Sequence, residues 1–194
     1  MPGDRTPDWL ARYEACGEVE RRDLDRVRRL WDETPDPYDR ALPLHLTGSA
    51  VVVDPATGTV LLRWHERQNA WLHVGGHGDP GEVDLYRIAL REASEETGLE
   101  DLKPCSAVAE TGGDAPLLPI HLVVVPVAPK GDEPAHEHAD VRYVLATATP
   151  ELARPESDSA VLRWVPIGQA VAEVDPNLGE ALRRVQRRCS GSSP

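Results

Sequence analysis

One segment of 25 residues, 75–99, constrains this chain more than any other part of the sequence. It reads GGHGDPGEVDLYRIALREASEETGL, a glycine-rich loop followed by a stretch with helical periodicity. Asp84 is a favourable N-cap residue and Gly98 stands where a C-cap glycine belongs, so the sequence predicts a helix from about residue 84 to residue 97. The glycines before it allow close backbone approach, which fixes a strand against this helix.

The predicted helix carries three carboxylates, Glu92, Glu95 and Glu96, at spacings of three and four residues, so they share one face. At an effective dielectric constant near 20, each like-charge pair about 5 Å apart costs on the order of 3 kcal/mol. We expect Arg91 to serve one of these carboxylates but not all three. A hard, oxygen-preferring cation such as Mg²⁺ would serve all of them, whereas the alternative is a solvated acidic face. The preceding glycine-rich loop favours the cation site.

The segment resembles the signature of the Nudix hydrolases. That signature is a Gly, five residues, a Glu, seven residues, and then Arg-Glu-apolar-x-Glu-Glu-x-Gly-apolar. Here Gly76 is followed by five residues and Glu82, and residues 91–99 match every fixed position of the second half. The spacing departs once, because eight residues separate Glu82 from Arg91. This departure leaves the role of Glu82 open.

The resemblance implies an enzyme that hydrolyses a nucleoside diphosphate linked to another moiety, by attack of water on a diphosphate phosphorus. The implied ligands of a Mg²⁺ or Mn²⁺ ion are Glu92, Glu95 and Glu96. Arg91 is implied to orient a glutamate, and Glu95 is also counted among the catalytic residues. The implied fold is an α/β/α sandwich with a mixed β-sheet, and the implied partner is a small diphosphate substrate.

Hydrophobic periodicity outside this segment predicts an α+β chain with helices at both ends. The expected strands cover residues 44–54, 59–65, 71–74, 104–110, 119–128, 138–147 and 161–165. The expected helices cover residues 8–33, with a break at Gly17, and residues 84–97, 167–173 and 177–188. We divide the chain into a helical N-terminal extension and linker (1–42), a Nudix domain (43–189) and a disordered tail (190–194).

The composition excludes several classes of partner. Acidic residues number 33 and basic residues 21, which gives a formal net charge of −12 and no footprint for DNA, RNA or an anionic membrane. The N-terminus lacks an apolar signal core, and no apolar run approaches the roughly 18 residues of a membrane span. The three scattered cysteines are expected to be reduced thiols, so we expect a cytoplasmic protein. A homodimer is included among the expected assemblies.

The loop at residues 129–140 supplies candidates for the general base. The signature, called the Nudix box, covers residues 76–99. Its glutamates would be poor proton acceptors when bound to a metal, so a carboxylate on a mobile loop is favoured as the general base. We predict Glu137 in this role, with Glu133 or a box glutamate as alternatives. The neighbouring His136 and His138 indicate zinc as a further alternative, although no third soft ligand stands near them in the sequence. His138, Asp140 and Arg142 alternate with apolar residues, which suits an interior strand bordering a substrate cleft or an exposed edge strand.

Arg63, His73 and His138 are expected to contact the substrate, with ordinary strand-surface positions as the alternative. His45, Thr47 and Ser49 alternate on the first strand and are weaker candidates of the same kind. Two rival functions share the fold. One is an isopentenyl diphosphate isomerase, which needs a reactive cysteine, and Cys105 lies outside any such site. The other is a non-catalytic module that senses nucleotide derivatives, against which the complete set of box glutamates argues.

Overall fold

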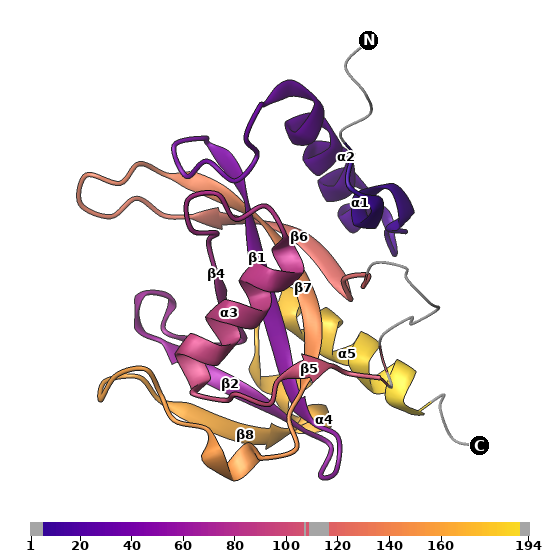
Figure 1. The fold of residues 1–194 in the computed structure, drawn as a ribbon, viewed down its shortest axis with the longest axis vertical. Coiled ribbons are helices and arrows are strands. Elements are labelled where there is room, and N and C mark those ends of the chain that lie inside the picture. Colours follow the sequence, from indigo (N-terminus) through magenta and orange to yellow (C-terminus); the bar gives the residue numbers. More distant parts are fainter. Residues whose placement is uncertain (1–5, 107, 109–116, 191–194) are drawn as a thin grey trace.

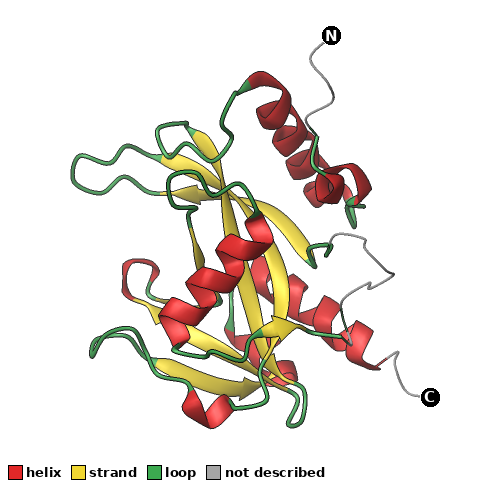
Figure 2. Ribbon diagram, in the orientation of Figure 1, coloured by secondary structure: helices red, strands yellow, loops and turns green. Residues whose placement is uncertain are grey.

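The structure, a computed structural model, describes residues 6–106, 108 and 117–190 (Figure 1, Figure 2). Its helices are α1 (Asp8–Arg12), α2 (Glu18–Glu33), α3 (Leu85–Thr97), α4 (Ile167–Glu173) and α5 (Pro176–Ser190). Its strands are β1 (Leu44–Asp54), β2 (Thr59–His65), β3 (Ala70–Leu72), β4 (Val74–Gly76), β5 (Lys103–Pro104), β6 (His121–Val127), β7 (His136–Ala146) and β8 (Leu162–Pro166). Two short 3₁₀ helices, Glu66–Gln68 and Pro150–Leu152, lie in connections.

A mixed sheet of eight strands is organised around β1. β1 pairs in parallel with β7, from Leu44 opposite Glu137 to Val53 opposite Ala146. It pairs antiparallel with β2 and with β4, while β5 and β6 pair antiparallel with β7. β7 is therefore an interior strand, which confirms the first of the two alternatives for its polar face. The mixed sheet confirms the predicted α+β class.

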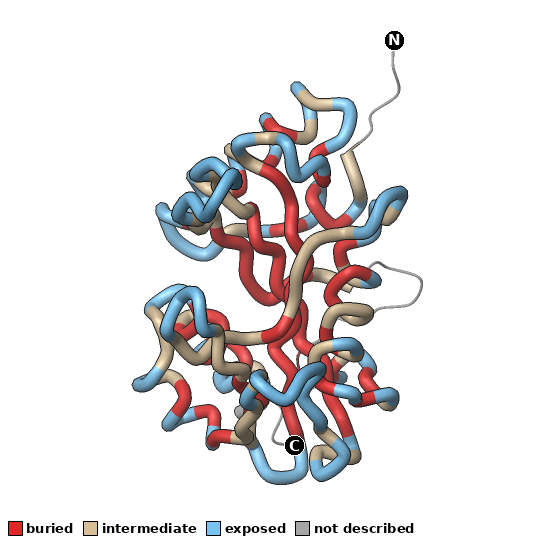
Figure 3. Tube along the Cα trace, turned by 90° about the vertical axis from the view of Figure 1, so that its left-hand side faces the viewer, coloured by how far each residue is buried: buried red, intermediate tan, exposed pale blue. Residues whose placement is uncertain are grey.

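Helices cover both faces of this sheet, with α3 in front of β1 and α5 behind it in Figure 1. Because side chains alternate along a strand, successive residues of β1 enter different cores. Ala50 and Val52 pack in the core that includes α2 and α3, whereas Val51 and Val53 pack with residues of α4 and α5. Buried residues follow the central strands, and exposed residues gather at loops (Figure 3). The predicted α/β/α sandwich is confirmed.

The N-terminal helices are joined to the sheet by a buried carboxylate, Glu20 of α2, which is 4% exposed. It accepts hydrogen bonds from two nitrogens of Arg184 in α5, at 2.8 and 2.9 Å, and from the Leu122 backbone N–H at 3.1 Å. The linker is also packed, because the Tyr38 hydroxyl donates to the Val83 carbonyl at 2.7 Å. Gly17, at φ +93°, separates α1 from α2 as predicted.

The ends of α3 follow the local signals in the sequence. The Asp84 carboxylate accepts from the backbone N–H groups of Tyr86 and Arg87, at 3.0 and 3.2 Å, and this caps the first turn. Gly98 ends the helix at φ +66°, a left-handed conformation that glycine adopts without strain. The predicted helix and both of its caps are confirmed.

Other predicted elements need correction. Residues 71–74 are not one strand, because the chain changes partner from β2 to β1 between β3 and β4. The strand expected at 104–110 is limited to Lys103–Pro104, while residues 107, 109 and 110 lie outside the described residues. β7 begins earlier than expected, inside the predicted loop. α5 includes Ser190, and the rest of the predicted disordered tail is outside the described residues.

No helix among the described residues combines the length and the apolar character that a bilayer span requires. The three cysteines are free, as expected for reduced thiols.

Candidate active site

Arg91 on α3 is the centre of a carboxylate cluster. Its Nη2 donates to Glu82 at 2.9 Å, and its Nε lies 3.2 Å from both Glu82 oxygens. Its Nη1 reaches Glu95 at 2.9 Å and Glu92 at 3.1 Å. Arg91 therefore contacts two of the three helix carboxylates, where the sequence predicted one, and Glu82 in addition; as predicted, it does not contact all three. The guanidinium is planar with donors on several sides, which allows this arrangement.

Glu82 joins the cluster despite the additional residue before Arg91. The glycine-rich loop absorbs that residue ahead of the helix, since α3 still begins immediately after Asp84. The Glu82 carboxylate also accepts the Asp79 backbone N–H at 2.8 Å, which closes the loop on itself. Arg91 Nη2 donates to the His77 carbonyl at 2.9 Å. The loop is thus held against the first half of α3.

Glu92 and Glu96 are the least exposed carboxylates of the cluster, with side chains 19% and 14% exposed. A Cβ atom on Gly76 would lie 2.8 Å from the Glu92 carboxyl carbon, so the Glu92 carboxylate packs directly against this glycine. Glu96 accepts the Gly75 backbone N–H at 3.0 Å, and its other oxygen lies 3.5 Å from Arg63 Nε. The two carboxylates therefore touch the strand that precedes the loop.

Burial disfavours the ionised forms of these two acids. It raises the pKa of Glu96 to about 7, although Arg63 and the Gly75 N–H act in the opposite direction. Burial also raises the pKa of Glu92, against the charge of Arg91. A hard divalent cation would offset this cost, because it prefers oxygen ligands and stabilises the ionised carboxylates. Glu95 differs, because its side chain is 57% exposed and is bound to Arg91.

A cavity of about 650 Å³ lies next to this cluster, and Gly75 and Gly76 contribute to its wall. Its volume lies in the range of about 300–1,000 Å³ that is typical of small-molecule sites. Polar residues of four segments line it, among them Ser49, His73, His77, His138, Asp140 and Arg142. The cleft expected beside the polar face of β7 is therefore present.

Asp140 and Arg142 form a buried ion pair in the wall of this cavity, with Arg142 Nε 2.7 Å from the carboxylate. Asp140 also contacts His73 Nε2 at 3.0 Å and accepts from the Ser49 hydroxyl at 2.6 Å. Burial raises the Asp140 pKa, but the charge of Arg142 and the bonds from His73 and Ser49 outweigh it and hold that pKa below its ordinary value. Asp140 is thus held ionised and Arg142 is fixed in place.

The residues predicted to contact the substrate fall into two places. His73 and His138 line the cavity. Arg63 instead bridges two carboxylates, since it binds Glu96 and also Glu156 from the loop before β8. Glu156 is 93 positions from Arg63 in the sequence, so no local signal connects the two.

Glu137 lies on the opposite side of β7 from His138. Both of its carboxylate oxygens are bound by Arg26 of α2, at 3.1 and 2.5 Å. The hydrogen bonds from Arg26 lower the pKa of Glu137, which makes it a weaker proton acceptor. Glu133, the alternative base, does line the cavity and pairs with Arg67 at 3.1 Å. This geometry gives the general-base hypothesis for Glu137 no support.

The fold brings two further histidines to His138, although the sequence places no third soft ligand near His136 and His138. His45 and His77 join His138, and the ligand atoms of these three lie within 4.8 Å of one another. The parallel pairing of β1 with β7 places His45 directly opposite His138. The alternating polar residues of β1 and β7 indicated one polar face on each strand. Nothing in the sequence indicated that these two strands pair with each other.

A protein-family model, that of the NUDIX domain, matches residues 43–185. The chain belongs to the Nudix family. Residues 76–99 of the match hold the box, whose arginine and four glutamates form the cluster described above. No curated protein matches the chain in sequence.

Solved structures similar to this Nudix chain confirm its fold. A Caenorhabditis elegans Ap4A hydrolase in a binary complex is 19% identical, with a TM-score of 0.55, over 75% of this chain and 98% of that one. A Clostridium perfringens hydrolase of the NUDIX family is 21% identical, with a TM-score of 0.50, over 77% and 98%. The Escherichia coli dihydroneopterin triphosphate pyrophosphohydrolase is 17% identical, with a TM-score of 0.50, over 74% and 94%.

Proposed function

We propose that this Nudix protein hydrolyses the diphosphate bond of a nucleoside diphosphate linked to a second moiety. The observation that supports this most is the position of Glu92 and Glu96, half-buried against the glycines that also line the cavity. A half-buried carboxylate pair beside a cavity with a fixed arginine suits a substrate that is both anionic and bound through a cation.

In this proposal Glu92 and Glu96 would hold the Mg²⁺ or Mn²⁺ ion, and Glu95 lies beside them, bound to Arg91. The bound cation supplies charge neutralisation at the diphosphate and a lowered pKa of water. Arg91 positions Glu92 and Glu95 by contacting both. We assign Glu95 to accept the proton of the attacking water, because its carboxylate is exposed and Arg91 contacts one of its oxygens, whereas Arg26 binds both oxygens of Glu137, which faces α2.

Two residues of the cavity wall are proposed to contact the substrate. Arg142 presents a positive charge there, held by Asp140. His73 donates to Asp140 through Nε2 and can accept from the substrate through Nδ1, a buried atom that lacks a hydrogen-bond partner in the described part of the chain. A buried polar atom without a hydrogen-bond partner is a suitable contact for a ligand atom.

We expect turnover to depend completely on a divalent cation. The purified chain should release product from at least one member of a panel of nucleoside diphosphate derivatives when Mg²⁺ or Mn²⁺ is present. Chelation should abolish this turnover and added Mg²⁺ should restore it. Equal activity after exhaustive chelation would contradict the metal mechanism, and binding of the panel without any turnover would support the sensing module instead.

Glu137→Gln should leave kcat within about threefold of the unaltered chain, since general-base residues are worth about 10²–10⁴-fold and Glu137 faces away from the cavity. Glu95→Gln, which removes the assigned base, should lower kcat by at least a hundredfold in the same assay. If the Glu137 variant shows the larger loss of kcat, the assignment of the two glutamates is reversed.

A further inference from the structure

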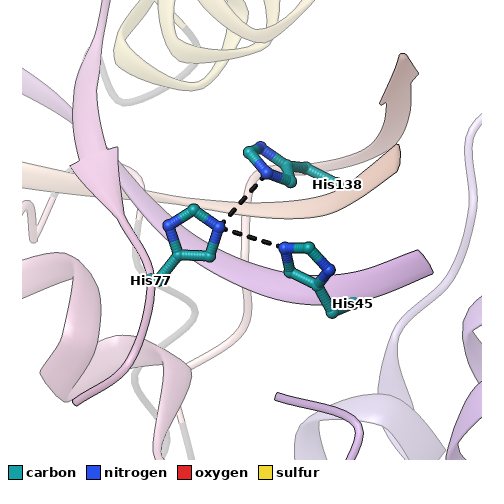
Figure 4. A group of neighbouring side chains, drawn as sticks. All are labelled: His45, His77 and His138. Carbon is teal, nitrogen blue, oxygen red and sulfur yellow. Dashed lines mark hydrogen bonds between the residues drawn. The ribbon is translucent and has the colours of Figure 1, made fainter. Parts of the chain in front are cut away.

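Three histidines from separate segments direct their rings toward one point beside the cavity (Figure 4). His45 comes from β1, His138 from β7, and His77 from the loop directly after β4. The Nε2 atom of His77 lies 3.0 Å from Nε2 of His45 and 3.2 Å from Nε2 of His138. Three nitrogen atoms of the same kind therefore converge without any carboxylate between them.

Hydrogen bonding alone cannot satisfy this arrangement of neutral rings. His45 Nδ1 lies 3.0 Å from the Leu42 carbonyl, which only accepts, so Nδ1 carries the proton and Nε2 is a lone pair. His77 Nε2 faces both partners and holds at most one proton. If it donates to His45, it has no lone pair with which to accept from His138. If it accepts from His138, its lone pair faces the lone pair of His45. One of the two contacts is unfavourable in either case.

A single cation that accepts all three lone pairs removes this conflict. In tetrahedral zinc sites the metal–nitrogen distance is about 2.0–2.1 Å, which separates neighbouring ligand atoms by about 3.3 Å. Two of the three spacings, 3.0 and 3.2 Å, are close to that edge length, and the third, between His45 and His138, is within 4.8 Å. The bond from His45 Nδ1 to a backbone carbonyl is also the outer contact that orients metal-bound histidines.

The ligand type separates this position from the carboxylate cluster. Imidazole suits zinc and related transition metals, whereas Mg²⁺ prefers oxygen. His136 adds a fourth imidazole, with Nε2 3.0 Å from His138 Nε2 and Nδ1 3.0 Å from the Pro134 carbonyl. Its Nε2 is therefore also a lone pair directed at the group.

We propose that His45, His77 and His138 bind one zinc-class divalent ion, independently of the carboxylate cluster. The ion would link the loop after β4 to both central strands. That loop carries the His77 carbonyl, which accepts from Arg91 at 2.9 Å. An ion at the histidine site would therefore restrain His77, whose carbonyl binds Arg91.

Calorimetric titration of the full chain with Zn²⁺ tests this, using protein without a histidine tag and stripped of metal by a chelator. We expect one Zn²⁺ ion per chain at the histidine site. His77→Ala and His138→Ala should each weaken that binding by at least about a hundredfold, because even outer-shell partners of a metal are worth 10–100-fold. Zn²⁺ at about a hundred times its Kd should raise the Tm of the unaltered chain by about 5–10 °C.

Two controls distinguish this site from other metal binding. His65→Ala removes a half-buried histidine of the cavity wall outside the trio and should keep the Zn²⁺ affinity. The double variant Glu92→Gln with Glu96→Gln should also keep it. The proposal is overturned if the unaltered chain binds no Zn²⁺ with a Kd below about 10 μM, if both histidine variants bind normally, or if the glutamate variant loses the ion. Thermal melting in chelator verifies folding, and His77→Ala, a loop substitution, decides alone if His138→Ala does not fold.

Discussion

Glu96→Gln should lower kcat by about 10²–10⁴-fold and at the same time make the metal-free protein more stable. Losing a carboxylate that holds the cation removes several kcal/mol of transition-state stabilisation, and each 1.36 kcal/mol is tenfold in rate. The gain in stability has a separate origin. The Glu96 carboxylate is 14% exposed, and burial makes its ionisation costly in the folded chain.

The sign of this gain follows from the pKa of Glu96. Burial raises this pKa from an ordinary value of 4.5 to about 7 in the folded state. The folded chain therefore holds the proton more tightly, and its stability declines as the pH rises from about 4.5 to about 7. Glutamine does not ionise, so the variant avoids this decline. Its advantage should grow across that interval and reach at most about 3 kcal/mol above pH 7.

Thermal melting in chelator at pH 5 and pH 8, together with kcat at saturating Mg²⁺, measures both effects. Glu100→Gln is a matched control, because Glu100 is exposed and lies just beyond the same helix. It should change neither kcat nor the Tm. A Glu96→Gln protein that melts earlier than the unaltered chain at pH 8 would show that the carboxylate has a structural role.

Local signals were sufficient to predict the centre of the fold. The caps of α3 and the period of two in β1 and β2 depend on residues close in sequence, and all three elements have the predicted bounds to within one residue. The short β5 and the change of partner between β3 and β4 were not predicted, because both depend on pairing with β1 and β7. Tertiary contacts decide short strands, so propensity says little about them.

The site shows the same division. The spacing of the box glutamates predicted a cluster, but the reach of Arg91 to Glu82 depends on how the loop folds back. The histidine trio depends on a parallel pairing of residues 93 positions apart, His45 and His138. For Glu137 the sequence contained the answer: His138, Asp140 and Arg142 share one face of a strand, so the adjacent Glu137 must lie on the other.

Asp140→Ala should reduce the free energy of unfolding by about 3–5 kcal/mol, the loss expected when one partner of a buried ion pair is removed. Arg142, with 4% of its side chain exposed, would keep its charge without a counter-ion. A chain of this length should then melt roughly 6–20 °C earlier. Asp25→Ala provides the matched control, because Asp25 and Arg28 form an exposed pair 3.6 Å apart and exposed pairs are worth at most about 1 kcal/mol.

The pH dependence and a double variant separate charge from packing in this result. The folded-state pKa of Asp140 is lowered below its ordinary value of 3.8, so its contribution is present above that pH and is lost as the pH falls further. Acidification below about pH 4 should therefore narrow the difference between Asp140→Ala and the unaltered chain. Asp140→Leu combined with Arg142→Met removes both charges and should recover at least half of the lost stability, because apolar pairs of similar volume replace buried ion pairs well. Urea unfolding of the four proteins measures these differences, and a double variant less stable than Asp140→Ala would mean that the hydrogen bonds from Ser49 and His73, rather than the paired charges, stabilise this part of the sheet.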